Sequence, residues 1–112
     1  IIIENIEYDI TRRQLGYDAD ILDEIVDIMV DTVCSTKPMI RIGGQDFPLE
    51  VVKSRLLKLN SEHINYVVSS LKSNTTKVRN IRAYLLTALY NAPTTISSYY
   101  AALVNHDLYG GG

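Results

Sequence analysis

The sequence predicts a mainly α-helical fold, a compact bundle of about five helices with one small β-hairpin insertion. Two patterns support this fold class. Apolar residues recur at helical spacing through most of the 112 residues, and one short strand-like segment is interrupted by two consecutive glycines. A chain of this length buries roughly two thirds of its unfolded surface in one domain. We therefore expect residues 1–112 to form a single helical domain.

The N-terminal third of the chain predicts two helices. Residues Tyr8 to Leu15 fit a short helix that Gly16 ends, and Asp18 to Cys34 has the clearest helical period. Asp18 or Asp20 is expected to cap the start of the second helix. The apolar side of this second helix holds Ile21, Leu22, Ile25, Ile28, Met29 and Thr32. Its acidic face holds Asp20, Asp23, Glu24, Asp27 and Asp31.

The segment that follows predicts a hairpin. Residues 39–42 and 45–47 have strand character, and Gly43-Gly44 between them supplies the turn. We expect the two isoleucines of the first strand on one face and Arg41 on the other. An isolated two-stranded ribbon is marginally stable, so the hairpin must pack on the helices.

The remainder of the chain predicts four helices. Pro48 suits the first position of one whose buried stripe is Leu49, Val52, Leu56 and Leu59. Three more share the spacing i, i+3, i+4, i+7: Ile64-Val67-Val68-Leu71, Ile81-Tyr84-Leu85-Ala88 and Ile96-Tyr99-Tyr100-Leu103. Asn60 or Ser61 is expected to cap the first, and residues 74–76 to separate it from the second. Pro93 is expected to end the second, which spans 78–92, and to open the third.

The charges are segregated along the chain. Residues 1–34 hold nine acidic and two basic residues, a net charge of −7, whereas residues 35–91 hold nine basic and three acidic residues, a net charge of +6. Between His63 and His106 the chain has no acidic residue, but it has four basic residues, Lys72, Lys77, Arg79 and Arg82. Because the acidic N-terminal segment would repel nucleic acid, this pattern excludes a generic polyanion binder.

Three of these cations mark a candidate interaction site. Lys77, Arg79 and Arg82 lie where a helix is predicted to begin, and the helix dipole disfavours positive charge there. An anionic partner, either phosphate backbone or an acidic protein face, would explain their position, and so would an acidic surface of the same domain. The candidate partner-binding or DNA-binding residues are Lys77, Arg79, Arg82, Leu86 and Tyr90.

Two interpretations of these residues stay open. Arginine, leucine and tyrosine on a second face of the helix match the composition of interaction hot spots, yet a second face can also contact another helix of the bundle. Tyr66 and Tyr90 are predicted to be free to stack on bases.

The acidic face is either solvent-facing or a docking face for a basic partner, including this domain's own cationic region. Self-association through that face is a further alternative.

The sequence indicates no catalytic residue, metal site or cofactor. Neither His63 nor His106 has a Cys or carboxylate at metal-ligand spacing, and we expect each to be a surface or capping residue. Cys34 is expected to be a buried or partly buried thiol of low reactivity. Gly43-Gly44 lacks the lysine and hydroxyl residue of a phosphate loop. No apolar run approaches the roughly 18 residues of a membrane span, and a single cysteine fits a reducing compartment, so we expect a cytoplasmic protein.

The order of several motifs resembles a known family. The motifs are Ile40-Arg41-Ile42-Gly43-Gly44, Phe47-Pro48, Val52-Lys53-Ser54-Arg55, Lys58-Leu59 and the run from Lys77 to Asn91 followed by Ala92-Pro93. Together they resemble the C-terminal domain of replication initiator A proteins of Gram-positive plasmids and integrative elements. More distantly, the chain is similar to the helical domain of DnaD-type primosome proteins. In the signature of those proteins a Tyr is followed by Ile four residues later and by Trp after four more. This chain departs from that signature, because Tyr84 is followed by Ala88 and Ala92 at these two positions.

The resemblance implies a role in starting DNA replication. In a modular initiator of this family, a separate N-terminal domain would recognise origin DNA, and this C-terminal domain would engage host replication proteins. The alternative is auxiliary DNA binding, in which Lys77, Arg79 and Arg82 contact the phosphate backbone. Both roles are non-catalytic.

Overall fold

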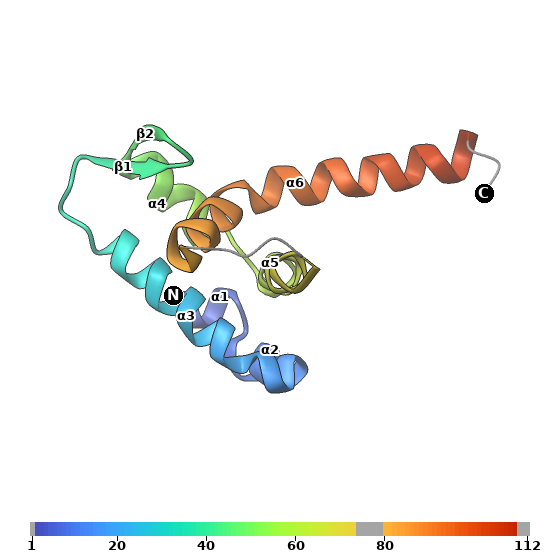
Figure 1. Cartoon of the computed structure of the whole chain (residues 1–112), viewed down its shortest axis with the longest axis horizontal. Helices are drawn as coiled ribbons and strands as arrows, with labels where there is room; N and C mark the ends of the chain where they lie inside the picture. Colours follow the sequence, from blue (N-terminus) through green and yellow to red (C-terminus); the bar gives the residue numbers. More distant parts are fainter. Residues whose placement is uncertain (1, 74–79, 110–112) are drawn as a thin grey trace.

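The computed structural model describes residues 2–73 and 80–109, with side chains for all of these except Asn5 and residues 98–109. Its elements are α1 (Ile2–Asn5), α2 (Tyr8–Leu15), a 3₁₀ turn (Gly16–Asp18), α3 (Ala19–Val33), β1 (Met39–Ile42), β2 (Gln45–Pro48), α4 (Leu49–Leu57), α5 (Ser61–Ser73) and α6 (Ile81–Tyr109) (Figure 1). The predicted helical bundle with one antiparallel hairpin is confirmed. The short helix α1 was not predicted.

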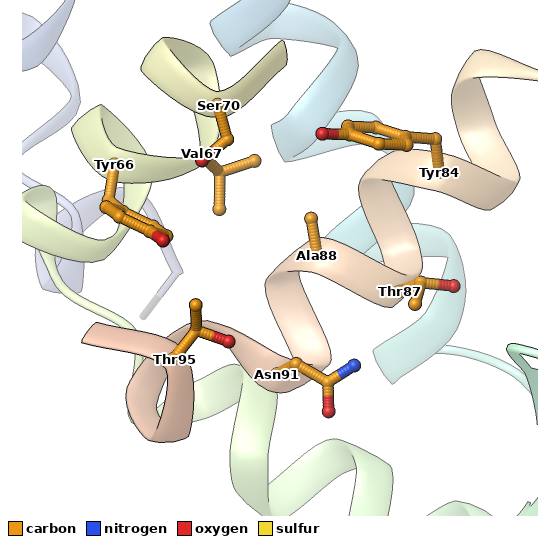
Figure 2. A pocket seen from close by; sticks show the side chains of 8 residues that line it. All are labelled: Tyr66, Val67, Ser70, Tyr84, Thr87, Ala88, Asn91 and Thr95. Carbon is orange, nitrogen blue, oxygen red and sulfur yellow. The ribbon is translucent and has the colours of Figure 1, made fainter. Parts of the chain in front are cut away.

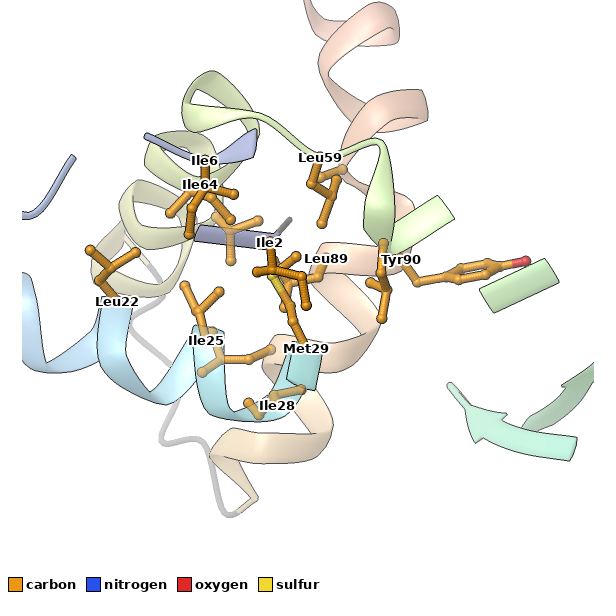
Figure 3. Close-up of a cluster of buried hydrophobic side chains, with 14 of the residues drawn as sticks. Ile2, Ile6, Leu22, Ile25, Ile28, Met29, Leu59, Ile64, Leu89 and Tyr90 are labelled. Atoms are coloured by element: carbon orange, nitrogen blue, oxygen red, sulfur yellow. The ribbon is translucent and has the colours of Figure 1, made fainter. Parts of the chain in front are cut away.

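The core forms where α3 meets α4, α5, the first half of α6 and the N-terminal segment (Figure 3). The predicted apolar side of α3 is confirmed, since Leu22 and Ile25 are fully buried and Ile28 and Met29 almost so. On α6 the predicted stripe is buried at Leu85, beside the fully buried Leu89, but not at Ile81, which is 49% exposed at the start of the helix. The core therefore fixes α6 against α3, and this contact positions the site described below.

The junction between α2 and α3 differs from the prediction in its cap. Gly16 ends α2 as expected, with a φ of +56° that an L-residue adopts at a cost. Asp18 precedes α3 but makes no side-chain capping bond. Its carboxylate instead accepts a hydrogen bond from Nζ of Lys72 at 2.8 Å. The predicted cap is wrong because a cation on α5 competes for the same carboxylate.

The hairpin turns as the two glycines predict. Gly43 and Gly44 both have positive φ, +59° and +82°, which is the conformation of a tight two-residue turn. Ile42 is buried, whereas Arg41 is exposed and pairs with Asp46 across the strands. Pro48 does not begin the next helix, because it pairs with β1 in an extended conformation (ψ 136°) and α4 starts one residue later.

The start of α5 carries a reciprocal cap. The side-chain oxygen of Asn60 accepts hydrogen bonds from the N–H groups of Glu62 and His63, at 3.0 and 3.2 Å. Nδ1 of His63 in turn accepts the N–H of Asn60 at 3.0 Å. The sequence prediction that Asn60 or Ser61 caps this helix is thus confirmed for Asn60, and His63 is a capping residue as expected.

This cap predicts a pH dependence. Burial lowers the pKa of His63, because desolvation disfavours the imidazolium. A lowered folded-state pKa means that the unfolded chain takes up the proton first, so stability should fall as the pH drops below about 6.5. Urea unfolding at about pH 7.5 and 5.5 measures this fall. The variant His63→Gln keeps an acceptor without titrating, and the fall should shrink in it; an equal fall in both proteins would contradict the assignment.

Helix α6 contradicts the predicted break at Pro93. The chain forms one helix from Ile81 to Tyr109 with Pro93 inside it, where two helices were expected. Proline removes a helical hydrogen bond, at a cost of about 3 kcal/mol. Arg55 on α4 bonds to residues on both sides of the proline, since Nε donates to the Tyr90 carbonyl at 2.9 Å and Nη2 donates to the Thr94 hydroxyl at 3.3 Å. The helix bends and its C-terminal part extends beyond the other elements (Figure 1).

Candidate functional site

The site predicted from the cations of the chain centres on Arg82, in the first turn of α6. Asn80 caps this turn through a hydrogen bond from the N–H of Ala83 to its side-chain oxygen, at 3.0 Å. The guanidinium of Arg82 reaches three carboxylates of α3. Its ion pairs are Nη1 to Glu24 at 2.8 Å, Nη1 to Asp27 at 2.9 Å and Nη2 to Asp31 at 2.9 Å.

The spacing of the three carboxylates explains why one guanidinium can meet them all. Glu24, Asp27 and Asp31 follow each other at i, i+3 and i+7, so they lie on one face of α3. Hydrogen bonds to Asp27 and then to Glu24 raise the pKa of Arg82. The Arg82 side chain is 48% exposed, so each pair alone contributes little, and only the network has a substantial effect.

The sequence left two explanations for these cations, an anionic partner or an acidic surface of the same domain. For Arg82 the second explanation applies. A carboxylate surface of the same domain holds this cation at the start of α6, and three negative charges surround one positive charge. The local excess of negative charge disfavours the approach of a phosphate. Lys77 and Arg79, the other two predicted cations, lie outside the described residues.

The two uncharged members of the predicted site pack inside the domain. Leu86 is half-buried against the core, and Tyr90 is 9% exposed. The Tyr90 ring lies 5.0 Å from the Phe47 ring, centroid to centroid, and the Arg55 guanidinium carbon lies 4.4 Å from its centroid. The prediction that Tyr90 is free to stack is wrong, because this second face of α6 meets α4 and the hairpin.

The sequence analysis did not predict a structural role for Arg55 beside α6. It stacks on Tyr90 and bonds to both sides of Pro93, so Arg55→Met should lower the free energy of unfolding by about 1–2 kcal/mol. Chemical unfolding measures this loss. Lys53→Met on the same helix is the matched control, since it removes a cation of α4 without removing these contacts. Equal losses in the two variants would show that the stack and the carbonyl bond are unimportant.

The acidic face of α3 is divided between partners within the chain. Asp23 forms an ion pair with Arg12 at 2.7 Å and accepts a hydrogen bond from the Tyr8 hydroxyl. Both hydrogen bonds lower the pKa of Asp23, and the bond from Tyr8 has the larger effect. Glu24, Asp27 and Asp31 bind Arg82, as described above. Asp20 is exposed, and the structure shows no ion pair for it among the described residues. The face thus docks mainly on this domain's own cations, which is one of the alternatives predicted.

Two shallow hollows flank the middle of α6. One, of about 260 Å³, lies between α5 and α6 and is lined by Tyr66, Ser70, Tyr84, Asn91 and Thr95 among others (Figure 2). The other, of about 310 Å³, lies between the hairpin and α6 and shares Thr87 and Asn91 with the first. Both linings are uncharged and contain no His or Cys, so neither gathers the groups of an acid–base or nucleophilic site.

The other reactive side chains do not converge with these hollows. Cys34 is exposed just after α3, so the prediction of a buried or partly buried thiol is wrong; α3 ends there and the chain leaves the core for the hairpin. His63 is occupied by its cap. Among the side chains that the structure describes, no three His, Cys, Asp or Glu residues are arranged to hold a metal ion.

Comparison with known proteins gives one match. A family model described as a family of unknown function (DUF6017) matches residues 1–111. No curated protein and no solved structure matches the chain. No helix in the described part of the chain has the length and apolar character that crossing a membrane requires.

Proposed function

We propose that this chain, which belongs to the DUF6017 family of unknown function, is a non-catalytic interaction domain of a replication initiator from a plasmid or mobile element. In this proposal it acts in the cytoplasm and recruits a host replication protein when DNA replication starts. The resemblance of its central motifs and of the run from Lys77 to Asn91 to replication initiator A proteins supports this role.

One structural observation carries the proposal. Helix α6 has 29 residues, a length of about 43 Å, and its C-terminal part extends beyond the bundle (Figure 1). The Arg82 pairs attach its start to α3, and Arg55 attaches Tyr90 and Thr94, on either side of its proline, to α4. A helix that is fixed at one end and projects at the other is suited to docking in a groove of a partner protein.

Truncation of α6 in the complete initiator tests this role. A stop after Ile96 removes the projecting part and retains the residues that form the core. We expect plasmid copy number to collapse, while origin binding by the rest of the initiator and the thermal unfolding midpoint of the domain stay close to those of the intact protein. Replication at the normal copy number in the truncated initiator would refute recruitment through α6.

Auxiliary DNA binding ranks below this role. Of the three cations proposed for it, Arg82 is the one that the structure describes, and three carboxylates surround it. Phosphate contacts would make affinity for duplex DNA fall with salt, with a slope of about −0.9 per neutralised phosphate. Titration of the domain with a short duplex at low salt distinguishes the two roles, since recruitment alone requires no such binding.

A further inference from the structure

We propose a second docking surface, at the junction of α1 and α2, that binds a protein segment in which a large apolar side chain is flanked by lysine or arginine. The surface is a hollow of about 350 Å³ lined by Ile3, Glu4, Glu7, Tyr8, Asp9 and Ile10. It lies apart from Arg82 and from the hollows beside α6. The inference does not depend on the replication role proposed above.

The apolar part of the lining, here called the floor, consists of Ile3, Ile10 and the Tyr8 ring, and the acidic part, here called the rim, consists of Glu4, Glu7 and Asp9. Ile3 and Ile10 are 54% and 52% exposed, whereas Ile2 and Ile6 beside them are buried in the core. The Tyr8 side chain is half-buried, and its hydroxyl bonds to Asp23 and to Arg12 hold it in place. Two large exposed aliphatic side chains in one hollow are a feature of protein interaction sites.

The rim of the hollow is negatively charged and uncompensated. Glu4, Glu7 and Asp9 form no ion pair with any described cation, unlike Asp23, Glu24, Asp27 and Asp31 of α3. The cations nearest in sequence do not neutralise them, because Arg12 pairs with Asp23 and Arg13 makes no ion pair within the described chain. Three carboxylates around an apolar floor favour a cationic partner and repel the phosphates of nucleic acid.

Glu7 has an unusual backbone conformation at this surface. Its backbone is left-handed, with φ 51° and ψ 58°, which is a disfavoured conformation for glutamate. It occupies the N-cap position of α2, yet its side chain makes no capping bond. Glycine or asparagine would meet the backbone requirement at lower cost. The glutamate adds a carboxylate to the rim without making a capping bond.

Two hydrogen bonds from Thr11 hold the junction together in the conformation that forms the surface. The buried Thr11 hydroxyl donates to the carbonyl of Ile6 at 2.6 Å, and the Thr11 N–H donates to the carbonyl of Glu7 at 2.9 Å. These two bonds fix α2 relative to the residues after α1. A preformed surface loses little conformational entropy on binding. The chemistry that fits it is an apolar residue on the floor and cations against the rim.

A labelled peptide tests the inference. The probe is a short peptide with two adjacent leucines flanked on each side by lysines, titrated against the full chain and followed by fluorescence anisotropy. We expect saturable binding at about 0.05 M NaCl that weakens at about 0.5 M. The same peptide with serines in place of the leucines should bind roughly tenfold less tightly, and so should the intact peptide to Ile10→Ser.

Matched charge variants distinguish this site from general attraction to an acidic protein. The double variant Glu4→Gln with Asp9→Asn should weaken binding roughly tenfold, whereas Glu50→Gln, an exposed carboxylate on α4, should leave it unchanged. Circular dichroism verifies that each variant folds. The inference is overturned if the leucine peptide fails to bind at low salt, if the serine peptide binds equally well, or if the double variant binds like the unmodified chain.

Discussion

Replacing Arg82 with Glu should lower the thermal midpoint of unfolding more than any other single charge change on the surface between α3 and α6. The substitution places a fourth carboxylate against Glu24, Asp27 and Asp31, all within 2.9 Å of the present guanidinium. Attraction becomes repulsion at every pair, and the contact between the start of α6 and α3 is lost. Because these side chains are exposed, about 1 M NaCl should restore part of the midpoint. Circular dichroism melts at low and high salt measure both effects.

Two further variants separate the ion pairs from other effects of the substitution. Arg13→Glu reverses an exposed cation that has no ion pair in the described chain, and it should change the midpoint little. Adding Asp27→Arg to the Arg82→Glu variant creates a reversed pair and should recover stability. If Arg13→Glu and Arg82→Glu lower the midpoint equally, the network does not hold α6. High salt should restore part of the stability of Arg82→Glu. If this variant recruits the partner under those conditions, Arg82 is structural and contacts no partner.

The elements that the sequence predicted well are those defined by local patterns. The apolar period of α3, the two glycines of the hairpin and the Asn60 cap each depend on residues within a few positions of one another. Local geometry decides these features, so spacing along the chain is sufficient to predict them. The cap expected from Asp18 failed for the opposite reason, since its carboxylate binds Lys72, which lies far along the chain.

The proline of α6 shows the same limit more clearly. By local rules Pro93 ends a helix, and the sequence around it gave no reason to expect otherwise. The hydrogen bonds that accompany the continuous helix come from Arg55, 35 and 39 residues away from its two partners. That arginine also covers the Tyr90 ring, which had been expected to be exposed. Long-range contacts of one side chain thus accompany both of these wrong predictions.

The sequence predicted which charged residues belong to the candidate site, but not which of them form ion pairs with one another. The segregation of charge identified both the cations and the acidic face, and an internal contact between them was one of the alternatives. Which contact forms depends on how α6 lies against α3, and that arrangement is decided by burial of Leu85 and Leu89. A guanidinium and three carboxylates at i, i+3 and i+7 are a complementary pattern that could have favoured the internal alternative. The acidic hollow between α1 and α2 required the structure, because Ile3 and Ile10 look like core residues in the sequence.

Leu89→Ala tests whether this burial holds the site together. Leu89 is fully buried at the centre of the cluster in Figure 3, so the truncation should leave a cavity and lower the free energy of unfolding by about 3 kcal/mol. Urea unfolding measures the loss, with an unchanged dependence on denaturant if the fold is kept. Ile81→Ala removes the same kind of side chain from an exposed position of the same helix, and it should cost less than about 1 kcal/mol.

The two alanine variants also connect the core to the ion pairs. If burial of Leu89 positions α6, its truncation should weaken the Arg82 network, so Leu89→Ala and Arg82→Glu combined should destabilise the domain by less than the sum of the single effects. Additive losses would show that the core and the network stabilise α6 independently. In that case the ion pairs could be removed without disturbing the helix, and the carboxylates of α3 would become available to a cationic partner.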